Sequence, residues 1–357
     1  MSVVAEAFIT GQDSKTLAEL GEFGLIKALS SWLPPGRGTL VGIGDDAAVL
    51  AVPDGRVVAT TDFLLEGRHF RLDWSGAADV GHKAAARSLA DLAAMGAEPS
   101  ALLVALAAPP ELPVAWAREL ARGLADECAR AGASVIGGDT ARADHVLLAV
   151  TGLGDLAGRA PVCRSGAAAG DLVAVAGPLG HAAAGLALLT AGLTAGLTAG
   201  VRDDPLVRAH LRPAPPYDAG PEAADLGATA MIDVSDGLLA DLGHVADASG
   251  VRIDLDSGAL RPAQDLLAAA RAVAGPRLHS TRTGLVTRPA DATALQWVLT
   301  GGEDHCLAAT FPPGTRLPPR WRVIGAVLSG EGHSGQGHGV VVDGQPRAES
   351  PGWDHFS

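Results

Sequence analysis

Aspartates that follow apolar runs, most of them beside glycine, recur along this chain and are the residues most suited to chemistry. They occur in four fragments, Gly42-Ile43-Gly44-Asp45-Asp46, Thr60-Thr61-Asp62, Gly137-Gly138-Asp139-Thr140 and Ile232-Asp233-Val234-Ser235-Asp236-Gly237. Mg²⁺ prefers hard oxygen ligands and usually binds through one or two carboxylates together with substrate phosphates. Glycine lets the backbone approach a phosphate closely. The pattern therefore indicates a metal site that handles a polyphosphate.

The adjacent pair Asp45-Asp46 is the sharpest local sign, because neighbouring carboxylates repel each other unless a cation neutralises them. A single Asp-Gly fragment is an ordinary turn signal, so only the whole set of aspartates indicates a metal site. A fifth acid, Asp91, lies in an alanine-rich stretch that predicts a helix. Lys83, Arg87 and Asp91 are spaced by four and share one face of that helix. We expect this face to point toward a metal–phosphate site.

The elements that position these acids can be predicted from hydrophobic periodicity and from glycine and proline stops. We expect helices at 15–33, 77–95, 114–131, from 181 onward, 220–226 and 238–249, and strands at 56–61, 101–107, 134–136, 146–151, 171–176, 230–234, 251–255, 307–311 and 321–327. Residues 257–291 give no clear pattern, and 330–339 read as a Gly/His loop in a hairpin. Strands and helices mix without strict alternation, which favours an α+β fold with antiparallel or mixed sheets.

Length and composition bound the function. A chain of 357 residues is long enough for two domains, and the Gly/Arg/Pro-rich stretch at 158–170 predicts a junction between domains 1–157 and 158–357. The net charge of −13 argues against a general nucleic-acid binder. Three scattered cysteines without a Cys-x-x-Cys pair argue against a zinc site or a disulfide framework. The first 30 residues lack a signal-peptide layout, so we expect a soluble cytoplasmic enzyme.

One uncharged stretch, Ala182 to Val201, has the length of a membrane span. It holds four Gly and three Thr and repeats Thr-Ala-Gly-Leu. We therefore interpret it as a soluble helix that runs into a low-complexity segment, and we expect no membrane association.

Familiar nucleotide and hydrolase motifs are missing from the sequence. It contains no Gly-x-x-x-x-Gly-Lys-[Ser/Thr] loop, no protein-kinase catalytic loop, no nucleophile elbow around Ser235 and no His-Glu-x-x-His helix. The aspartate set is thus the main candidate for chemistry.

The order of the motifs resembles that of the thiamine-monophosphate kinases over nearly the whole chain. The matching segments are Gly42 to Ala48, Thr60 to Asp62, Gly67 to Phe70, Asp91 to Ala97, Gly137 to Thr140, Arg164 to Gly166, Asp233 to Leu238, Gly301 to Asp304 and Gly352 to Phe356. The resemblance implies a two-domain aminoimidazole-ribonucleotide synthetase-like fold, with an N-terminal α/β domain and a C-terminal α+β domain that completes the ATP and substrate cleft. It also implies a homodimer in which the N-terminal domains pair into a β-barrel.

The implied activity is ATP-dependent phosphorylation of thiamine monophosphate to thiamine diphosphate, by direct in-line transfer with several Mg²⁺ ions and no covalent nucleophile. The metal ligands implied by the resemblance are Asp46, Thr60, Thr61, Asp62, Asp91, Asp139, Asp233 and Asp236. The implied ATP contacts are Gly138, Asp139, Arg164 and Ser235. The implied contacts to thiamine monophosphate are His69, Glu303 and Trp353, where the Trp face suits a cationic ring.

The chain departs from the family pattern in three places. The segment from about Arg261 to Ala290 is longer than in the family pattern, and we expect it to alter the substrate mouth. Ser88-Leu89-Ala90-Asp91 stands where Asn-Leu-Ser-Asp is usual, and His305-Cys306 stands where Tyr-Glu is usual. Polar contacts around the metal and the substrate are therefore expected to differ here. The sequence leaves two alternatives open: another ATP-dependent enzyme of the same superfamily, and a non-catalytic nucleotide- or thiamine-binding regulator.

Overall fold

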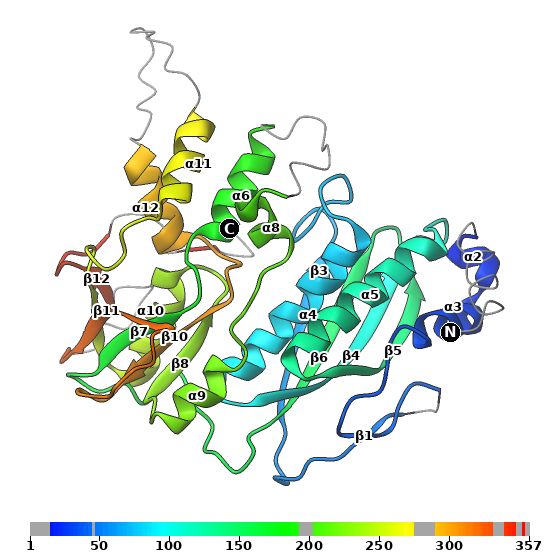
Figure 1. Ribbon diagram of the computed structural model, residues 1–357, viewed down its shortest axis with the longest axis horizontal. Coiled ribbons are helices and arrows are strands. Elements are labelled where there is room, and N and C mark those ends of the chain that lie inside the picture. The colour runs from blue at the N-terminus through cyan, green and yellow to red at the C-terminus, as the bar shows by residue number, and fades with distance from the viewer. Residues whose placement is uncertain are drawn as a thin grey trace, which may run out of the picture. The chain divides into compact units, whose positions relative to one another are not determined.

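The chain folds into two compact units, each built around its own β-sheet (Figure 1). The computed structural model describes residues 15–44, 47–192, 203–274, 290–330, 339–347 and 352–353. The first unit comprises Met1–Ala93 and Ala97–Arg159, and the second comprises Ala94–Gly96 and Ala160–Ser357. Asp46, a predicted metal ligand, lies outside the described residues.

The sheet of the first unit has four strands in the order β3-β6-β4-β5. Their bounds are β3 Val58–Leu65, β4 Glu98–Ala108, β5 Ser134–Arg142 and β6 Leu147–Asp155. β4 and β5 run parallel, while β3–β6 and β4–β6 are antiparallel pairs. The two edge strands, β3 and β5, are therefore the ones that carry Asp62 and Asp139.

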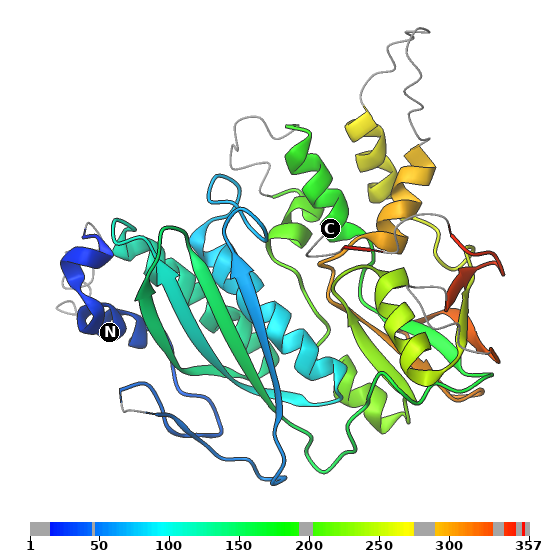
Figure 2. The ribbon, with the colours of Figure 1, turned by 180° about the vertical axis from the view of Figure 1, so that it is seen from behind.

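Two long helices, α4 (Ala77–Ala94) and α5 (Val114–Ala131), cover one face of this sheet (Figure 1). They pack backbone to backbone, because a Cβ at Gly81 would lie 2.1 Å from the Leu120 carbonyl oxygen and one at Gly123 would lie 2.1 Å from the Ala78 carbonyl oxygen. Figure 2 shows the opposite face of the sheet, over which no described helix of this unit lies. The two faces thus offer different surroundings to alternate residues of each strand.

The N-terminal segment is broken into two helices where one was predicted. α2 (Leu17–Leu20) ends at Gly21, whose φ of 69° is left-handed, and α3 (Glu22–Ser30) starts anew after it. Thr16 and Glu19 form a reciprocal capping box at the start of α2. A small two-stranded sheet of β1 (Thr39–Val41) and β2 (Val49–Leu50) follows.

The second unit holds a six-stranded sheet in the order β12-β9-β11-β7-β10-β8. The strands are β7 Leu172–Ala176, β8 Ala230–Val234, β9 Arg252–Leu255, β10 Cys306–Phe311, β11 Trp321–Leu328 and β12 Val340–Val342. All neighbours are antiparallel except β12 and β9, which are parallel. The predicted hairpin around 330–339 is therefore wrong, because β12 pairs with β9 and not with β11.

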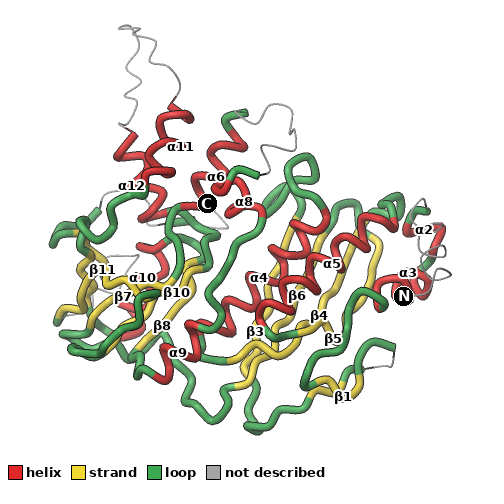
Figure 3. Tube along the Cα trace, viewed as in Figure 1, coloured by secondary structure: helices red, strands yellow, loops and turns green. Residues whose placement is uncertain are grey.

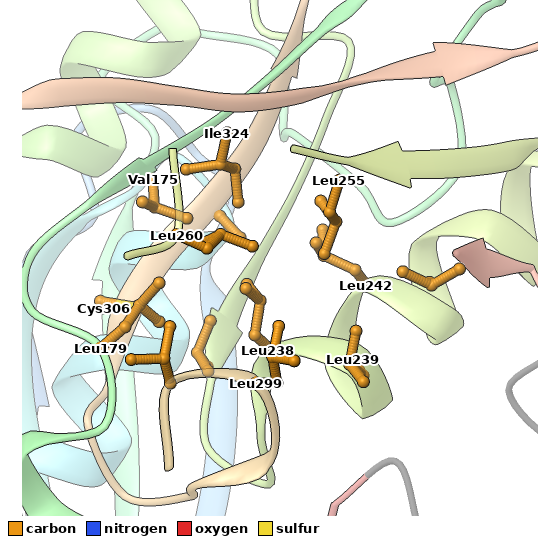
Figure 4. Packing of buried hydrophobic residues seen from close by; sticks show 14 of the residues in the cluster. Val175, Leu179, Leu238, Leu239, Leu242, Leu255, Leu260, Leu299, Cys306 and Ile324 are labelled. Carbon is orange, nitrogen blue, oxygen red and sulfur yellow. The ribbon is translucent and has the colours of Figure 1, made fainter. Parts of the chain in front are cut away.

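Six described helices surround this sheet. They are α6 His181–Thr190, α8 Pro205–Leu211, α9 Ala219–Asp225, α10 Leu238–Ser249, α11 Gln264–Ala274 and α12 Ala290–Thr300. α10 packs on β8, β9 and β12, and its buried leucines join strand residues in one apolar core. Figure 4 shows Leu238, Leu239 and Leu242 of α10 in this core with Leu255 and Ile324 of the sheet.

Most predicted elements are present within a few residues of their expected bounds (Figure 3). β3 and β5 are longer than predicted, so Asp62 and Asp139 lie inside strands and not at their ends. α11 was not predicted, and the rest of the segment that gave no pattern includes residues 275–289, which lie outside the described part. The chain has the predicted mixed α+β fold. Among the described residues, no helix has both the length and the apolar composition needed to span a membrane.

Candidate functional site

A compact set of polar side chains joins β3 to α4 in the first unit. Thr60 Oγ1 donates a 2.6 Å hydrogen bond to Asp91 Oδ2. Ser88 Oγ donates to Asp62 Oδ2 at 2.8 Å, and Arg87 lies 3.8 Å from Asp62 Oδ1. Two predicted metal ligands on different elements are therefore held on the same face of the sheet.

The shared face predicted for Lys83, Arg87 and Asp91 is confirmed. Lys83 is buried, and its Nζ donates at 3.0 Å to the carbonyl oxygen of His69 in the loop that follows β3. Arg87 and Asp91 reach β3 itself. This face of α4 therefore orients both the strand and the His69 loop.

The ring of His69 is tied into its own loop. Its Nδ1 accepts a 3.0 Å hydrogen bond from the Leu65 amide. A neutral imidazole that accepts at Nδ1 carries its proton on Nε2. This hydrogen bond fixes the orientation of the His69 ring relative to the end of β3.

Thr61 and Asp139 lie on the opposite face of the same sheet. Neighbours along a strand point to opposite faces, so Thr61 faces away from Thr60, and its hydroxyl lies 3.3 Å from that of Thr151. Through the register of the sheet, Asp139 lies in the same row as exposed Phe63 and therefore on the same face. The structure thus brings Thr60, Asp62 and Asp91 together but does not bring Thr61 and Asp139 to that face.

Gly138 is required by the contact between β4 and β5. A Cβ at this position would lie 1.9 Å from the Val104 carbonyl oxygen. The structure thus explains this glycine by the close packing of the β5 backbone against the β4 backbone. The ATP contact expected of Gly138 stays a prediction.

In the second unit, the loop between β8 and α10 gathers the other predicted residues. The Glu303 amide donates to the Ser235 carbonyl oxygen at 2.7 Å, and the Trp353 amide donates to the Asp236 carbonyl oxygen at 2.9 Å. Trp353 remains 61% exposed, so its indole face is open to a ligand. Ser235, Asp236, Glu303 and Trp353 are therefore neighbours, although the sequence separates them widely.

The buried carboxylate of Asp241 binds the backbone of this loop. Asp241, in the first turn of α10, accepts hydrogen bonds of 3.0 Å from the Asp236 and Gly237 amides. Burial, and next the charges of Asp233 and Asp236, raise the pKa of Asp241 to about 8. The β8–α10 loop is thus a region of concentrated negative charge, which a cation would relieve.

His305 and Asp304 extend this buried polar region. His305 Nδ1 lies 3.1 Å from Asp233 Oδ2. Asp304 accepts hydrogen bonds from the Gly180 and Ala182 amides and so caps the N-terminus of α6. Burial raises the pKa of Asp304 to about 7, against the opposing effect of these amide donors.

The loop that carries Arg164 is pinned by one hydroxyl. Ser249 Oγ donates to the Arg164 carbonyl oxygen at 3.1 Å and accepts from the Gly166 and Ala167 amides at 3.1 and 3.2 Å. Gly166 has a φ of 131°, and a Cβ there would lie 2.4 Å from the Thr229 carbonyl oxygen. The backbone of the predicted ATP loop is therefore held in one conformation.

Sequence reasoning missed Asp241 and Ser249 as supporting residues, and it marked Ser88 and His305 only as places where polar contacts differ, without naming their partners. Ser88 precedes Asp91 by three positions on the same helix, and this spacing was a usable signal. Asp241 lies in the first turn of a helix that starts after Asp236-Gly237, and this position was a second usable signal in the sequence. Ser249 and His305 could be connected to their partners only through tertiary structure.

The donor set fits Mg²⁺ that is shared with substrate phosphates. Within the described ranges, no group of three or more His, Cys, Asp or Glu side chains forms a ready metal cage. The carboxylates occur instead in pairs or singly. Hydroxyls orient Asp62 and Asp91, an imidazole contacts Asp233, and the Thr140 amide donates to Asp139. Such sparse carboxylate sets are how Mg²⁺ is usually bound when phosphate oxygens complete its coordination.

Comparison with known proteins places the chain in a family. Residues 44–156 match the N-terminal domain of AIR synthase related proteins, and residues 168–299 match the C-terminal domain. The chain is 46% identical to thiamine-monophosphate kinase of Mycobacterium tuberculosis over 344 residues, which cover 96% of this chain and 94% of that protein.

Two solved structures agree with this assignment. Thiamine-monophosphate kinase from Stenotrophomonas maltophilia K279a superposes with a TM-score of 0.71 at 34% identity, covering 90% of this chain and 95% of the other. AaThiL complexed with AMPPCP and TMP superposes with a TM-score of 0.71 at 31% identity, covering 96% and 99%. With the shared fold and the similarity along nearly the whole length, the chain belongs to the thiamine-monophosphate kinase family.

Proposed function

We propose that this chain transfers the γ-phosphoryl group of ATP to the terminal phosphate of thiamine monophosphate, giving thiamine diphosphate and ADP. The observation that carries the proposal is its 46% identity to a thiamine-monophosphate kinase over 96% of the chain. The related AaThiL structure, complexed with AMPPCP and TMP, supports ATP as the phosphoryl donor.

The chemistry requires positioning more than acid–base catalysis. An oxygen of the acceptor phosphate attacks the γ-phosphorus, the bond to the β-phosphate oxygen breaks, and ADP leaves with the electron pair. The attacking oxygen is already anionic, so no strong general base is needed. The difficulty is to bring two anions together in line. The site residues accordingly include several carboxylates and cations and no activated nucleophile.

Mg²⁺ would be held by Asp46, Thr60, Thr61, Asp62, Asp91, Asp139, Asp233 and Asp236. When bound, it supplies charge neutralisation and alignment of the phosphates. The chain's own part is to hold the carboxylates in place: Thr60 orients Asp91, Ser88 and Arg87 orient Asp62, and His305 contacts Asp233. Thr61 faces away from Thr60, so its most direct route to a metal shared with Thr60 is its backbone carbonyl.

The nucleotide and the acceptor would use separate residues. Gly138, Asp139, Arg164 and Ser235 are the proposed ATP contacts. His69, Glu303 and Trp353 are the proposed contacts to thiamine monophosphate. The His69 ring is held in place by the Leu65 amide, and Trp353 offers an exposed aromatic face to the cationic ring.

We also propose a domain boundary between residues 157 and 158, giving domains 1–157 and 158–357. We propose a cytoplasmic location, where ATP is available.

We further propose a homodimer formed through the uncovered sheet face of the first unit. Phe63 is 56% exposed on this face, and Leu65 on the same side of β3 is 37% exposed. An exposed apolar sheet face of this kind marks an interaction surface. Sedimentation of wild type and Phe63→Glu tests it: the wild type sediments as a dimer and the variant shifts toward monomer.

The activity is tested by a coupled ADP-release assay with Mg²⁺ and ATP, offering thiamine monophosphate, thiamine or aminoimidazole precursors. ADP release with thiamine monophosphate alone, with thiamine diphosphate as product, supports the proposal. Turnover on another acceptor would favour a different enzyme of the superfamily. Nucleotide binding without any turnover would favour a regulator.

A further inference from the structure

We propose that His305 is a positioning residue, whose Nδ1–H holds the Asp233 carboxylate in the orientation in which it binds Mg²⁺ together with a nucleotide. This rests on the proposed function, in which Asp233 is a metal ligand.

The contact is buried and specific. His305 stands just before β10 and Asp233 stands in β8, and their side chains meet at 3.1 Å between Nδ1 and Oδ2. His305 is 2% exposed and Asp233 is 5% exposed. A carboxylate that binds a metal only accepts hydrogen bonds, so in the proposed role of Asp233 the His305 Nδ1 is the donor. The contact uses Oδ2, and Oδ1 is the oxygen that we assign to the cation.

The second ring nitrogen shows which contact orients the imidazole. Nε2 of His305 is buried and has no hydrogen-bond partner within the described part of the chain. Buried polar atoms in folded proteins are nearly always paired, so a purely structural histidine would be expected to satisfy both nitrogens. The ring is instead oriented by its contact with Asp233.

The backbone supports the same conclusion. His305 has a left-handed φ of 50° and Glu303 has one of 67°, a conformation that side chains other than glycine, asparagine, aspartate and histidine rarely adopt. The His305 amide is fixed at 2.9 Å from the Val234 carbonyl oxygen, directly beside Asp233. Strained backbone of this kind gathers at functional sites, and here it delivers the ring to the carboxylate.

A fixed orientation matters because Asp233 stands among other acids. Asp236 follows Asp233 by three positions, and Asp241 Oδ2 accepts 3.0 Å hydrogen bonds from the Asp236 and Gly237 amides. Without a donor on one oxygen, the Asp233 carboxylate would turn away from these charges. Partners that orient a metal ligand are typically worth about 10- to 100-fold in metal affinity.

The test measures AMPPCP binding to the full chain by calorimetry over a series of Mg²⁺ concentrations. His305→Asn keeps an N–H donor near the Nδ1 position and tolerates the left-handed backbone. His305→Gly also tolerates that backbone but removes the donor, and His305→Ala is a second donor-free variant in case the glycine variant fails to fold. His210→Asn, which changes a buried histidine of α8, is the matched control.

We expect the donor-free variants to need at least about 10-fold more Mg²⁺ for half-maximal AMPPCP binding. His305→Asn and His210→Asn should stay within about threefold of wild type, and thermal melting should show all tested variants folded. Wild-type Mg²⁺ dependence in a folded donor-free variant would overturn the proposal. Because no acceptor is present, failure to phosphorylate thiamine monophosphate would leave this result standing. Wild-type binding that ignores Mg²⁺ would overturn both proposals.

Discussion

Thr60 Oγ1 donates a 2.6 Å hydrogen bond to Asp91 Oδ2 and thereby joins an edge strand to the helix that covers it. The bond orients a carboxylate that is only partly buried, on a helix face that also carries Lys83 and Arg87. Both oxygens belong to residue types that Mg²⁺ accepts as ligands.

Replacing Asp91 with Asn should abolish turnover while preserving the fold. The substitution removes a charge from the proposed metal site but keeps the shape of the side chain, so we expect kcat/KM to fall at least about 100-fold. Steady-state kinetics at saturating Mg²⁺ and thermal melting check this. Asp126→Asn, an exposed change on α5, is the control. Near-normal activity of Asp91→Asn would remove Asp91 from the site.

The two threonines of β3 should behave differently, because they face opposite sides of the sheet. Thr60→Val removes the hydroxyl that orients Asp91, and we expect the Mg²⁺ concentration for half-maximal activity to rise about 10-fold. Thr61→Val leaves the backbone carbonyl in place, so the Mg²⁺ concentration for half-maximal activity should rise much less. A Mg²⁺ titration of ADP release measures both. An equal rise in this Mg²⁺ concentration for both variants would mean that the Thr61 hydroxyl itself contacts a metal.

Adjacent glycines of β5 should differ in their tolerance of a methyl group. Gly138→Ala places a Cβ against the Val104 carbonyl oxygen, and we expect the free energy of unfolding to fall by at least about 2 kcal/mol. Gly137→Ala meets the Leu103 side chain at 3.0 Å, which can rotate away, so the change should stay within about 1 kcal/mol. Urea unfolding of the two variants compares them. If Gly138→Ala lost as little stability as Gly137→Ala, β4 and β5 would have to move apart easily to accept the methyl group.

Asp304 should make stability depend on pH. Burial raises its pKa from 3.8 to about 7, so the folded state binds its proton more tightly than the unfolded state does. The contribution is therefore complete below the unfolded pKa and is lost as pH rises through the folded pKa. We expect wild type to lose stability relative to Asp304→Asn between about pH 4 and pH 7. Wild type that gains stability relative to Asp304→Asn as the pH rises would contradict the raised pKa.

The sequence by itself was sufficient to predict the family, most helices and strands, and the face of α4 that Lys83, Arg87 and Asp91 share. Motif order pointed to the thiamine-monophosphate kinases, and the i, i+4 spacing of Lys83, Arg87 and Asp91 correctly predicted that they point one way. These features are local: helix periodicity and glycine stops act over a few residues, and motif order survives without any knowledge of contacts. The expected single helix at 15–33 failed for an equally local reason, the left-handed Gly21.

Only the tertiary structure decided which partners the acids have. Asp62 looked like the end of a strand, but pairing with β6 continues β3 to Leu65, and the register then puts Thr60 and Asp62 on one face and Thr61 on the other. His305 meets Asp233 across 72 positions of sequence, because β10 pairs beside β8 in the sheet. Strand order and register arise from packing between distant segments, and a one-residue change of register would reverse every face. For that reason, the sequence could name the aspartates but could not say which hydroxyl, imidazole or guanidinium orients each of them.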